Sequence, residues 1–323
     1  MKKKSIITVG IVIAVFVCST LLIRLIKITG ISSDYIYNGY SSEFIFDDEK
    51  YAYTKNLAPK IINKNESVDF DIEMFSKSSK KPMYSDGTNV YFLTDDNGIY
   101  YYDQKFNMHC LISNKKILDT SFLGDWFSND GFIEMQDDYL NSATQFVVVG
   151  TYIYLYCPGG VFRYNLITHF KSTIYDGKTG ETSFSYSDYK IYFQDELYNL
   201  YCYDTEKNEF IELDIKPYSF CVNNKGILFS DLENDMYLTY YDFEKNRKYI
   251  IRNNETIAYD LDEDMIYYSV EGEYYKSELT GKGKVMLCKD KNSSILKKGV
   301  NCLYIVYDYN GDVKVDSIDL KTN

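Results

Sequence analysis

The chain is built on a short repeat, and this repeat limits its possible folds more than any other feature. The clearest copy covers residues 190–213 and reads KIYFQDELYNLYCYDTEKNEFIEL. Polar turn residues separate three runs of aromatic and β-branched residues, a pattern typical of short β-strands joined by tight turns. The second turn ends at Asn208, a residue that tolerates positive φ and therefore suits a hairpin bend.

The opening run of this unit recurs along the chain at a regular interval. Copies begin at residues 153, 191, 227, 266 and 303, so successive copies lie 36 to 39 residues apart. Another apolar stretch precedes most copies, which gives about four strands in about 40 residues, the size of a β-propeller blade. We therefore expect an all-β fold, a β-propeller of six to eight four-stranded blades with seven as the best estimate.

The repeat resembles the YWTD-type propellers of lipoprotein-receptor ectodomains. The pattern I-Y-F-x-D followed by Y-x-Y-D occurs at 191–195 and 201–204. It looks more closely like the TolB-like or YWTD-like propellers of uncharacterised bacterial membrane-anchored proteins. The segment YKSELTG at 275–281 resembles their Y-K-x-x-L-D-G segment, with Thr280 in place of Asp. The resemblance covers roughly residues 82–320 and implies a propeller fold without implying a particular ligand.

Residues 1–27 are predicted to be a transmembrane anchor. Three lysines, Lys2 to Lys4, precede the uncharged run 6–23, and a helix of that length spans about 27 Å, near the thickness of the hydrocarbon core. A cleaved signal peptide and a lipoprotein at Cys18 remain alternatives, although the sequence shows no clean cleavage site. The basic N-terminus favours a cytoplasmic N-terminus and an extracellular C-terminal part at the cell membrane.

Residues 28–81 have two interpretations, and residues 82–323 carry the repeats. The runs FIFDD and YAYTK near residues 44–55 resemble a degenerate propeller blade, whereas 60–81 is mostly polar and suits a juxtamembrane stalk. The last unit has three strand-like runs and no fourth. Closed propellers complete such a blade with a strand from the other terminus, so residues 33–47 are expected to pair beside 313–320.

An insertion near residues 114–145 interrupts the period, because the copy at Val90 precedes the next by 63 residues. Long loops in compact β folds are often functional. This one holds the only tryptophan, Trp126, together with Asp125, Asp130 and Glu134. We predict that these four residues bind a ligand, with Trp126 stacking on a sugar or anchoring a protein. A degraded blade with Trp126 in its core is the alternative.

Other chemistries have little support in the sequence. The only histidines, His109 and His169, lie in strand-like segments, so neither a His-based zinc site nor a Ser-His-Asp triad is expected. The acidic turns at 95–98 and 260–264 lack the ligand spacing of a calcium loop. We therefore predict no metal and no cofactor. Six cysteines follow Cys18 without C-x-x-C spacing, and their strand positions favour buried thiols over disulfides.

Charge narrows the class of partner. The chain has a net charge of −12, and the part beyond residue 30 carries −17, so binding to nucleic acid is not expected. We expect a membrane-anchored extracellular module that binds or scaffolds a protein or a cell-wall or extracellular glycan. One alternative is a glycan-active hydrolase or lyase, which needs two Asp or Glu carboxylates about 5–10 Å apart. Another is a sensor or accessory domain for a neighbouring transporter.

Overall fold

The structure is a computed structural model of the 323-residue chain. It describes nine short strands between Tyr37 and Ile112, and then residues 143–166, 168, 170–253, 256, 258–289, 295–298, 302–309 and 312–320. Within these parts, no helix has the length and apolar character that crossing a membrane requires. The predicted anchor at 1–27 lies outside the described residues.

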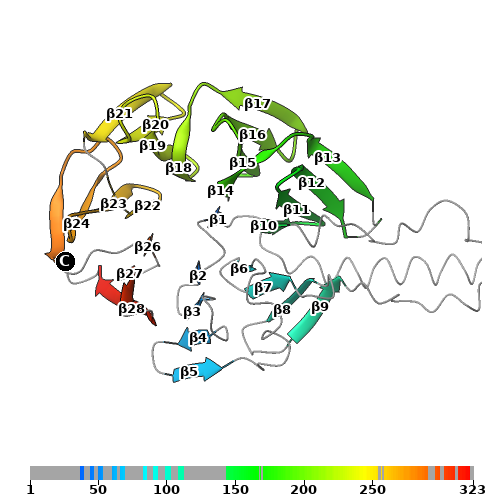
Figure 1. The fold of residues 1–323 in the computed structure, drawn as a ribbon, viewed down its shortest axis with the longest axis horizontal. Coiled ribbons are helices and arrows are strands. Elements are labelled where there is room, and N and C mark those ends of the chain that lie inside the picture. Colours follow the sequence, from blue (N-terminus) through cyan, green and yellow to red (C-terminus); the bar gives the residue numbers. More distant parts are fainter. Residues whose placement is uncertain are drawn as a thin grey trace, which may run out of the picture.

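The described residues form an all-β fold of seven antiparallel sheets (Figure 1). We number them along the chain. Sheet 1 contains β2 (Phe44–Phe46), β3 (Lys50–Tyr53), β4 (Lys60–Asn63) and β5 (Glu66–Asp69), and sheet 2 contains β6 (Met83–Ser85), β7 (Val90–Leu93), β8 (Ile99–Tyr102) and β9 (Met108–Ile112). Sheet 3 contains β10 (Gln145–Val149), β11 (Tyr152–Cys157), β12 (Gly160–Asn165) and β13 (Lys171–Tyr175).

The remaining sheets repeat this meander. Sheet 4 contains β14 (Thr179–Ser187), β15 (Lys190–Asp195), β16 (Leu200–Asp204) and β17 (Glu209–Leu213), and sheet 5 contains β18 (Pro217–Val222), β19 (Gly226–Asp231), β20 (Tyr237–Asp242) and β21 (Arg247–Arg252). Sheet 6 contains β22 (Ala258–Leu261), β23 (Met265–Val270), β24 (Glu273–Glu278) and β25 (Val285–Lys289), and sheet 7 contains β26 (Ile295–Lys298), β27 (Cys302–Tyr309) and β28 (Asp312–Asp319).

The sheets stand around a common centre, with the first strand of each sheet innermost (Figure 1). Consecutive first strands contact one another from β2 through β6, β10, β14, β18 and β22 to β26. This is a β-propeller-type fold. Strands near the centre pack against neighbouring sheets on both faces. The first strand β10 and the second strand β19 are therefore buried along their whole length and lack the alternation of a half-exposed strand.

Aromatic residues fill the spaces between the sheets. Tyr156 of sheet 3 stacks on Phe184 of sheet 4 with ring centroids 5.5 Å apart. The turn prediction is confirmed: Asn208 has φ 57°, and its copy Asn246 has φ 47°. Each side chain accepts a hydrogen bond from the tyrosine five residues earlier, Tyr203 and Tyr241, so the repeated motif stabilises the same bend in both sheets.

The strand pairing corrects the expected ring closure. The strand β1 (Tyr37–Gly39) does not pair with β28. It pairs antiparallel with β14, the innermost strand of sheet 4, with Tyr37 opposite Tyr186 and Gly39 opposite Phe184. Residues 44–69 supply the four strands of sheet 1. An apolar run can pair with any open sheet edge, and an inner edge offers the same backbone groups as an outer one.

The structure describes some of the residues for which the sequence predicted buried thiols, and it describes the two strands on either side of the predicted insertion. Cys157, Cys202, Cys221 and Cys302 are buried cysteines outside any disulfide, and Cys288 is a half-buried one. The strand β9 ends at Ile112 and β10 begins at Gln145. The predicted insertion joins these two strands. Its binding residues Trp126, Asp125, Asp130 and Glu134 lie outside the described residues.

Candidate functional site

The meander gives the ring two faces with different connections. Antiparallel strands reverse direction at each turn, so successive turns alternate between the two ends of a sheet. We call face A the end that carries the turns between first and second strands and between third and fourth strands. Face B carries the turns between second and third strands and the connections between sheets. The described turns of face A include 188–189, 205–208, 223–225, 243–246 and 262–264, and those of face B include 176–178, 196–199, 214–216 and 232–236.

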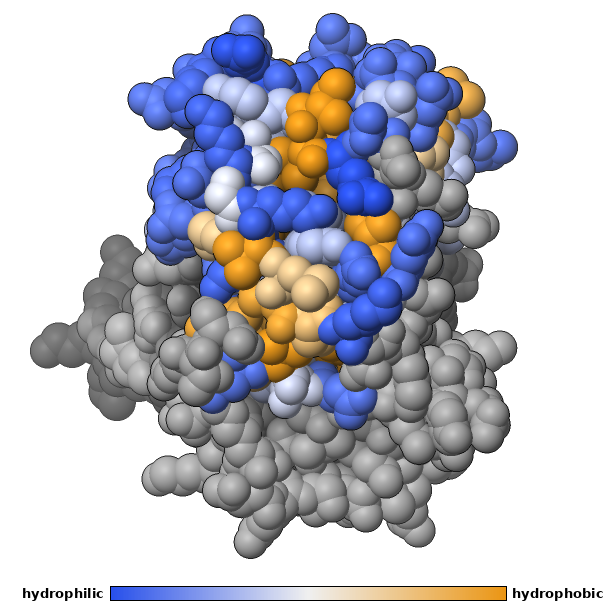
Figure 2. Space-filling view, turned by 90° about the vertical axis from the view of Figure 1, so that its left-hand side faces the viewer, coloured by the Kyte–Doolittle hydropathy of each residue, from blue (hydrophilic) through white to orange (hydrophobic). Residues whose placement is uncertain are grey.

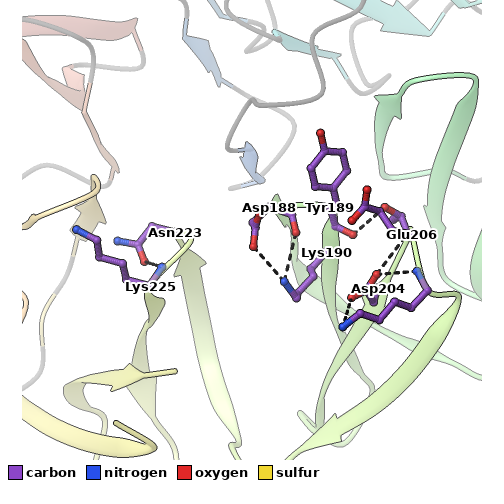
Figure 3. Close-up of polar contacts among 9 residues, drawn as sticks. Asp188, Tyr189, Lys190, Asp204, Glu206, Asn223 and Lys225 are labelled. Carbon is purple, nitrogen blue, oxygen red and sulfur yellow. Dashed lines mark hydrogen bonds and ion pairs between the residues drawn. The ribbon is translucent and has the colours of Figure 1, made fainter. Parts of the chain in front are cut away.

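Face A carries a cluster of oppositely charged residues near the inner ends of sheets 4 and 5 (Figure 3). The Lys190 ammonium lies 3.1 Å from a carboxylate oxygen of Asp188. The Lys225 ammonium lies 2.6 Å from a carboxylate oxygen of Asp264 in sheet 6. The Asn223 amide donates to the Asp262 carbonyl at 2.6 Å and so joins sheets 5 and 6. Each of these lysines is already paired, and exposed pairs of this kind contribute about 0–1 kcal/mol each.

Several aspartates of the repeat accept hydrogen bonds from groups within their own turns. One Asp195 carboxylate oxygen accepts the backbone N–H groups of Leu197 (2.9 Å) and Asn199 (2.8 Å). The other accepts the Asn199 amide at 2.8 Å and the Tyr201 hydroxyl at 3.2 Å. Asp231 repeats the pattern with the Glu233 backbone and the Asn234 amide. These carboxylates therefore stabilise turn geometry.

The aspartates on face A act in the same way. Burial would raise the pKa of Asp204, but the backbone N–H groups of Lys207 and Glu206 and the charge of Lys207 lower it below the usual value. Burial also opposes ionisation of Asp242, yet hydrogen bonds from the side chain and backbone of Lys245 lower its pKa. Both groups are ionised anchors of a turn at neutral pH. Among the described residues, no group of three His, Cys, Asp or Glu side chains has a metal-binding arrangement.

Asp260 is the exception, because it is a buried carboxylate on an innermost strand. It accepts the backbone N–H of Lys298 at 2.8 Å and so connects β22 to β26. Burial raises the pKa of Asp260, and the nearby charge of Lys297 opposes that shift. Asp260 therefore belongs to the seam between sheets 6 and 7.

Two tyrosine hydroxyls form hydrogen bonds at positions where the register of a strand pair shifts. The β18–β19 register shifts between Pro217 and Phe220. There the Tyr259 hydroxyl from sheet 6 donates to the Ser219 carbonyl (2.6 Å) and accepts the Ser230 N–H (3.2 Å). A second shift lies between β14 and β15, where the Tyr156 hydroxyl from sheet 3 contacts the Gly180 and Gln194 carbonyls. Bulges of this kind leave backbone groups unpaired within a sheet, and these hydroxyls supply the missing partners.

Face B bears a group of exposed apolar side chains over sheets 4 and 5, which we call the face B patch. The exposed fractions of the side chains are 67% for Leu197, 37% for Tyr198, 46% for Tyr218 and 38% for Leu232. The Tyr198 and Tyr218 rings stack with centroids 6.2 Å apart and planes at 25°. The Lys178 ammonium and the Glu196 carboxylate form an exposed ion pair of 3.3 Å beside the same turn.

The outer rim and a groove between two sheets are less suited to binding a ligand. The outer rim exposes Ile250 on β21 and Val285 and Met286 on β25. Figure 2 shows this side of the molecule, where hydrophobic groups are interrupted by hydrophilic ones. A groove between sheets 4 and 5 encloses about 230 Å³, which is less than the usual 300–1,000 Å³ of a small-molecule pocket. Its lining consists of Leu213, Asp214, Ile215, Tyr241, Asn246 and Lys248.

Sequence reasoning missed the face B patch. The pattern marks 196–199 as a turn, but it does not by itself mark these residues as a binding surface. Tyr198 itself was a usable signal. A tight turn between two strands usually carries Gly, Asn or Asp at the position that needs positive φ, so a bulky tyrosine in this turn is unusual.

Comparisons with known proteins support the fold. No protein-family model matches the chain, and no curated protein matches it. The extracellular domain of BT3049 from B. thetaiotaomicron, described as a hybrid two-component system, aligns at TM-score 0.54 and 10% identity over 86% of this chain and 40% of that chain. PorZ from Porphyromonas gingivalis, a bacterial surface component of the type-IX secretion system, aligns at TM-score 0.52 and 9% identity over 86% of this chain and 38% of that chain.

A third similar structure, Kluyveromyces lactis Hsv2, aligns at TM-score 0.51 and 9% identity over 88% of this chain and 100% of that chain. The chain spans about two fifths of the two bacterial proteins. Identities this low show the fold alone. Two of these three neighbours are extracellular or surface proteins.

Proposed function

We propose that this protein is a membrane-anchored extracellular module that binds a protein or a glycan through face B. The observation that carries the proposal is the contrast between the two faces. Lys190 and Lys225 on face A pair with aspartates, and Phe170 is the one large apolar side chain that a described turn of this face exposes. Face B instead gathers four exposed apolar side chains, Leu197, Tyr198, Tyr218 and Leu232. Exposed aromatic and aliphatic groups release free energy when a partner covers them, while already paired charges contribute little.

The path of β1 supports an outward orientation for face B. The strand β14 runs from face B to the 188–189 turn on face A, and β1 pairs antiparallel with it. The chain therefore passes Tyr37 on the side of face A and continues toward face B. Residues 28–36 connect the predicted anchor to this point and reach at most about 32 Å. Such a path favours an arrangement with face A toward the membrane and face B away from it.

The predicted binding residues of the insertion belong to a segment that is flanked by β9 and β10. The strand β9 is the fourth strand of sheet 2 and β10 is the first strand of sheet 3, so β9 ends and β10 begins at face B. Trp126, Asp125, Asp130 and Glu134 are therefore proposed as further contacts for the same partner. Nucleic acid is not proposed as a partner, because the net charge is −12.

The test compares two double variants of the full-length protein in lipid nanodiscs. Leu197→Asp with Leu232→Asp places two charges on the face B patch, and Ile250→Asp with Val285→Asp places two charges on the outer rim. Sedimentation with purified cell envelopes measures binding. We expect the face B variant to lose binding and the rim variant to retain it. Equal binding by both variants would remove the basis of the proposal.

A further inference from the structure

We propose that Tyr198 and Tyr218 form a binding platform for an uncharged saccharide. This inference rests on the proposed function and narrows it to a ligand class and a site. The two rings stack with centroids 6.2 Å apart at 25°, and both remain exposed. They come from adjacent sheets, Tyr198 from the 196–199 turn of sheet 4 and Tyr218 from β18 of sheet 5. Together they offer a broad aromatic surface at one end of the ring.

Local backbone irregularities position both rings. Tyr198 has φ 64°, a conformation that is unfavourable for a bulky side chain. Tyr218 lies within the shifted register of β18, between Pro217 and Phe220, and bulges redirect side chains in this way. A protein retains such conformations only when the surroundings impose them.

Buried groups impose these conformations. Asp195 holds the turn of Tyr198 through the N–H groups of Leu197 and Asn199, and its carbonyl accepts the Tyr198 N–H at 3.1 Å. The Tyr259 hydroxyl bridges the bulge that contains Tyr218. The platform is therefore rigid before a ligand arrives, which lowers the entropic cost of binding.

Polar groups beside the platform match the chemistry of sugar hydroxyls. The Glu196 carboxylate accepts hydrogen bonds and the Lys178 ammonium donates them, and both are exposed in a 3.3 Å pair. The Glu196 N–H donates to the Lys178 carbonyl at 3.2 Å, and this bond fixes the connection that carries Lys178 beside the turn that carries Tyr198. The weakly polarised C–H face of a pyranose ring can pack on the tyrosines while its hydroxyls reach this pair.

The size and charge of the patch favour an uncharged saccharide over a protein or an acidic glycan. A stable protein interface takes about 800 Å² and 20–30 residues from each partner, whereas the face B patch has four exposed apolar side chains. The neighbouring connections on face B add exposed acids, namely Asp176, Asp214, Glu233 and Asp235. These carboxylates repel uronic acids and phosphorylated polymers.

The test uses the full-length protein in nanodiscs and calorimetric titration with chitohexaose, cellohexaose and maltohexaose, with a hyaluronan hexasaccharide as the acidic probe. Tyr198→Asn removes the ring but suits the positive φ. Met236→Asn is the matched control, because Met236 has φ 61° in the equivalent turn of sheet 5. We expect at least one uncharged hexasaccharide to bind, at least tenfold weaker binding by Tyr198→Asn, and no change for Met236→Asn. Both variants should keep the melting temperature.

Two results would overturn the inference. One is the absence of binding by all three uncharged probes at concentrations up to about 10 mM, and the other is equal affinity of wild type and Tyr198→Asn. The envelope assay separates this failure from failure of the proposed function. If charges on Leu197 and Leu232 still abolish envelope binding, face B binds a partner of another class. If they do not, the proposed function fails as well.

Discussion

Replacing Tyr259 by Phe tests whether tyrosine hydroxyls join the sheets of this propeller. The change removes one oxygen from a buried side chain between sheets 5 and 6 and leaves the ring in place. That hydroxyl donates to the Ser219 carbonyl at 2.6 Å, accepts the Ser230 N–H at 3.2 Å and lies 2.6 Å from the Ser219 hydroxyl. The Tyr259→Phe variant would leave the Ser219 and Ser230 backbone groups without this partner at the β18–β19 bulge.

The expected loss follows from these contacts. A buried backbone group that loses its partner costs about 1–3 kcal/mol, and the hydroxyl serves one donor and one acceptor. We expect Tyr259→Phe to lower the free energy of unfolding by about 2–4 kcal/mol. For a domain of this size the melting temperature should fall by about 3–7 °C.

Thermal unfolding of the full-length protein in detergent, followed by tyrosine fluorescence and circular dichroism, measures the change. Tyr152→Phe is the matched control, because the Tyr152 ring, and not its hydroxyl, faces the Arg163 guanidinium at 4.9 Å. We expect this control to melt close to wild type. If Tyr259→Phe melts within about 1 °C of Tyr152→Phe, the hydroxyl does not stabilise the seam by the amount argued here.

Three further predictions concern pH, the anchor and the insertion. Burial raises the pKa of Asp260 against the opposing charge of Lys297, so the stability contributed by its protonated form is lost as the pH rises through the folded-state pKa. Wild type should therefore lose stability relative to Asp260→Asn as the pH rises above about 4, the ordinary pKa of an aspartate carboxyl, and parallel stability curves for the two proteins from there to neutral pH would contradict this. Cell fractionation should find full-length protein in the membrane with its C-terminal part open to external protease, whereas a shortened protein in the culture fluid would indicate cleavage. Deletion of residues 124–141 should leave a folded protein by circular dichroism with reduced envelope binding, because loops tolerate length changes better than blades do, and unfolding would show that this stretch is a blade.

The repeat made much of the architecture predictable. The runs at Ile191 and Leu200 and the turn at Asn208 are local patterns, because strand periodicity and turn chemistry depend on residues only a few positions apart. An all-β fold of about seven four-stranded units followed from counting such runs, and the described residues form seven sheets, six of which contain a four-stranded meander. The candidate site was harder to predict from the sequence, since its two tyrosines are 20 residues apart and belong to different units.

Local sequence patterns specify where strands and turns occur, whereas the packing of the sheets selects which strand edges and side chains meet. The pattern of residues 33–47 predicts a strand but does not indicate which strand it pairs with. In the fold, Tyr37 pairs with Tyr186 of β14. In the same way Tyr259 reads as one more strand tyrosine until the fold brings its hydroxyl to Ser219 and Ser230, 40 and 29 residues away. The physical reason is that every strand edge presents the same N–H and C=O groups. The choice among edges therefore depends on the packing of whole sheets around the ring, which no short stretch of sequence records.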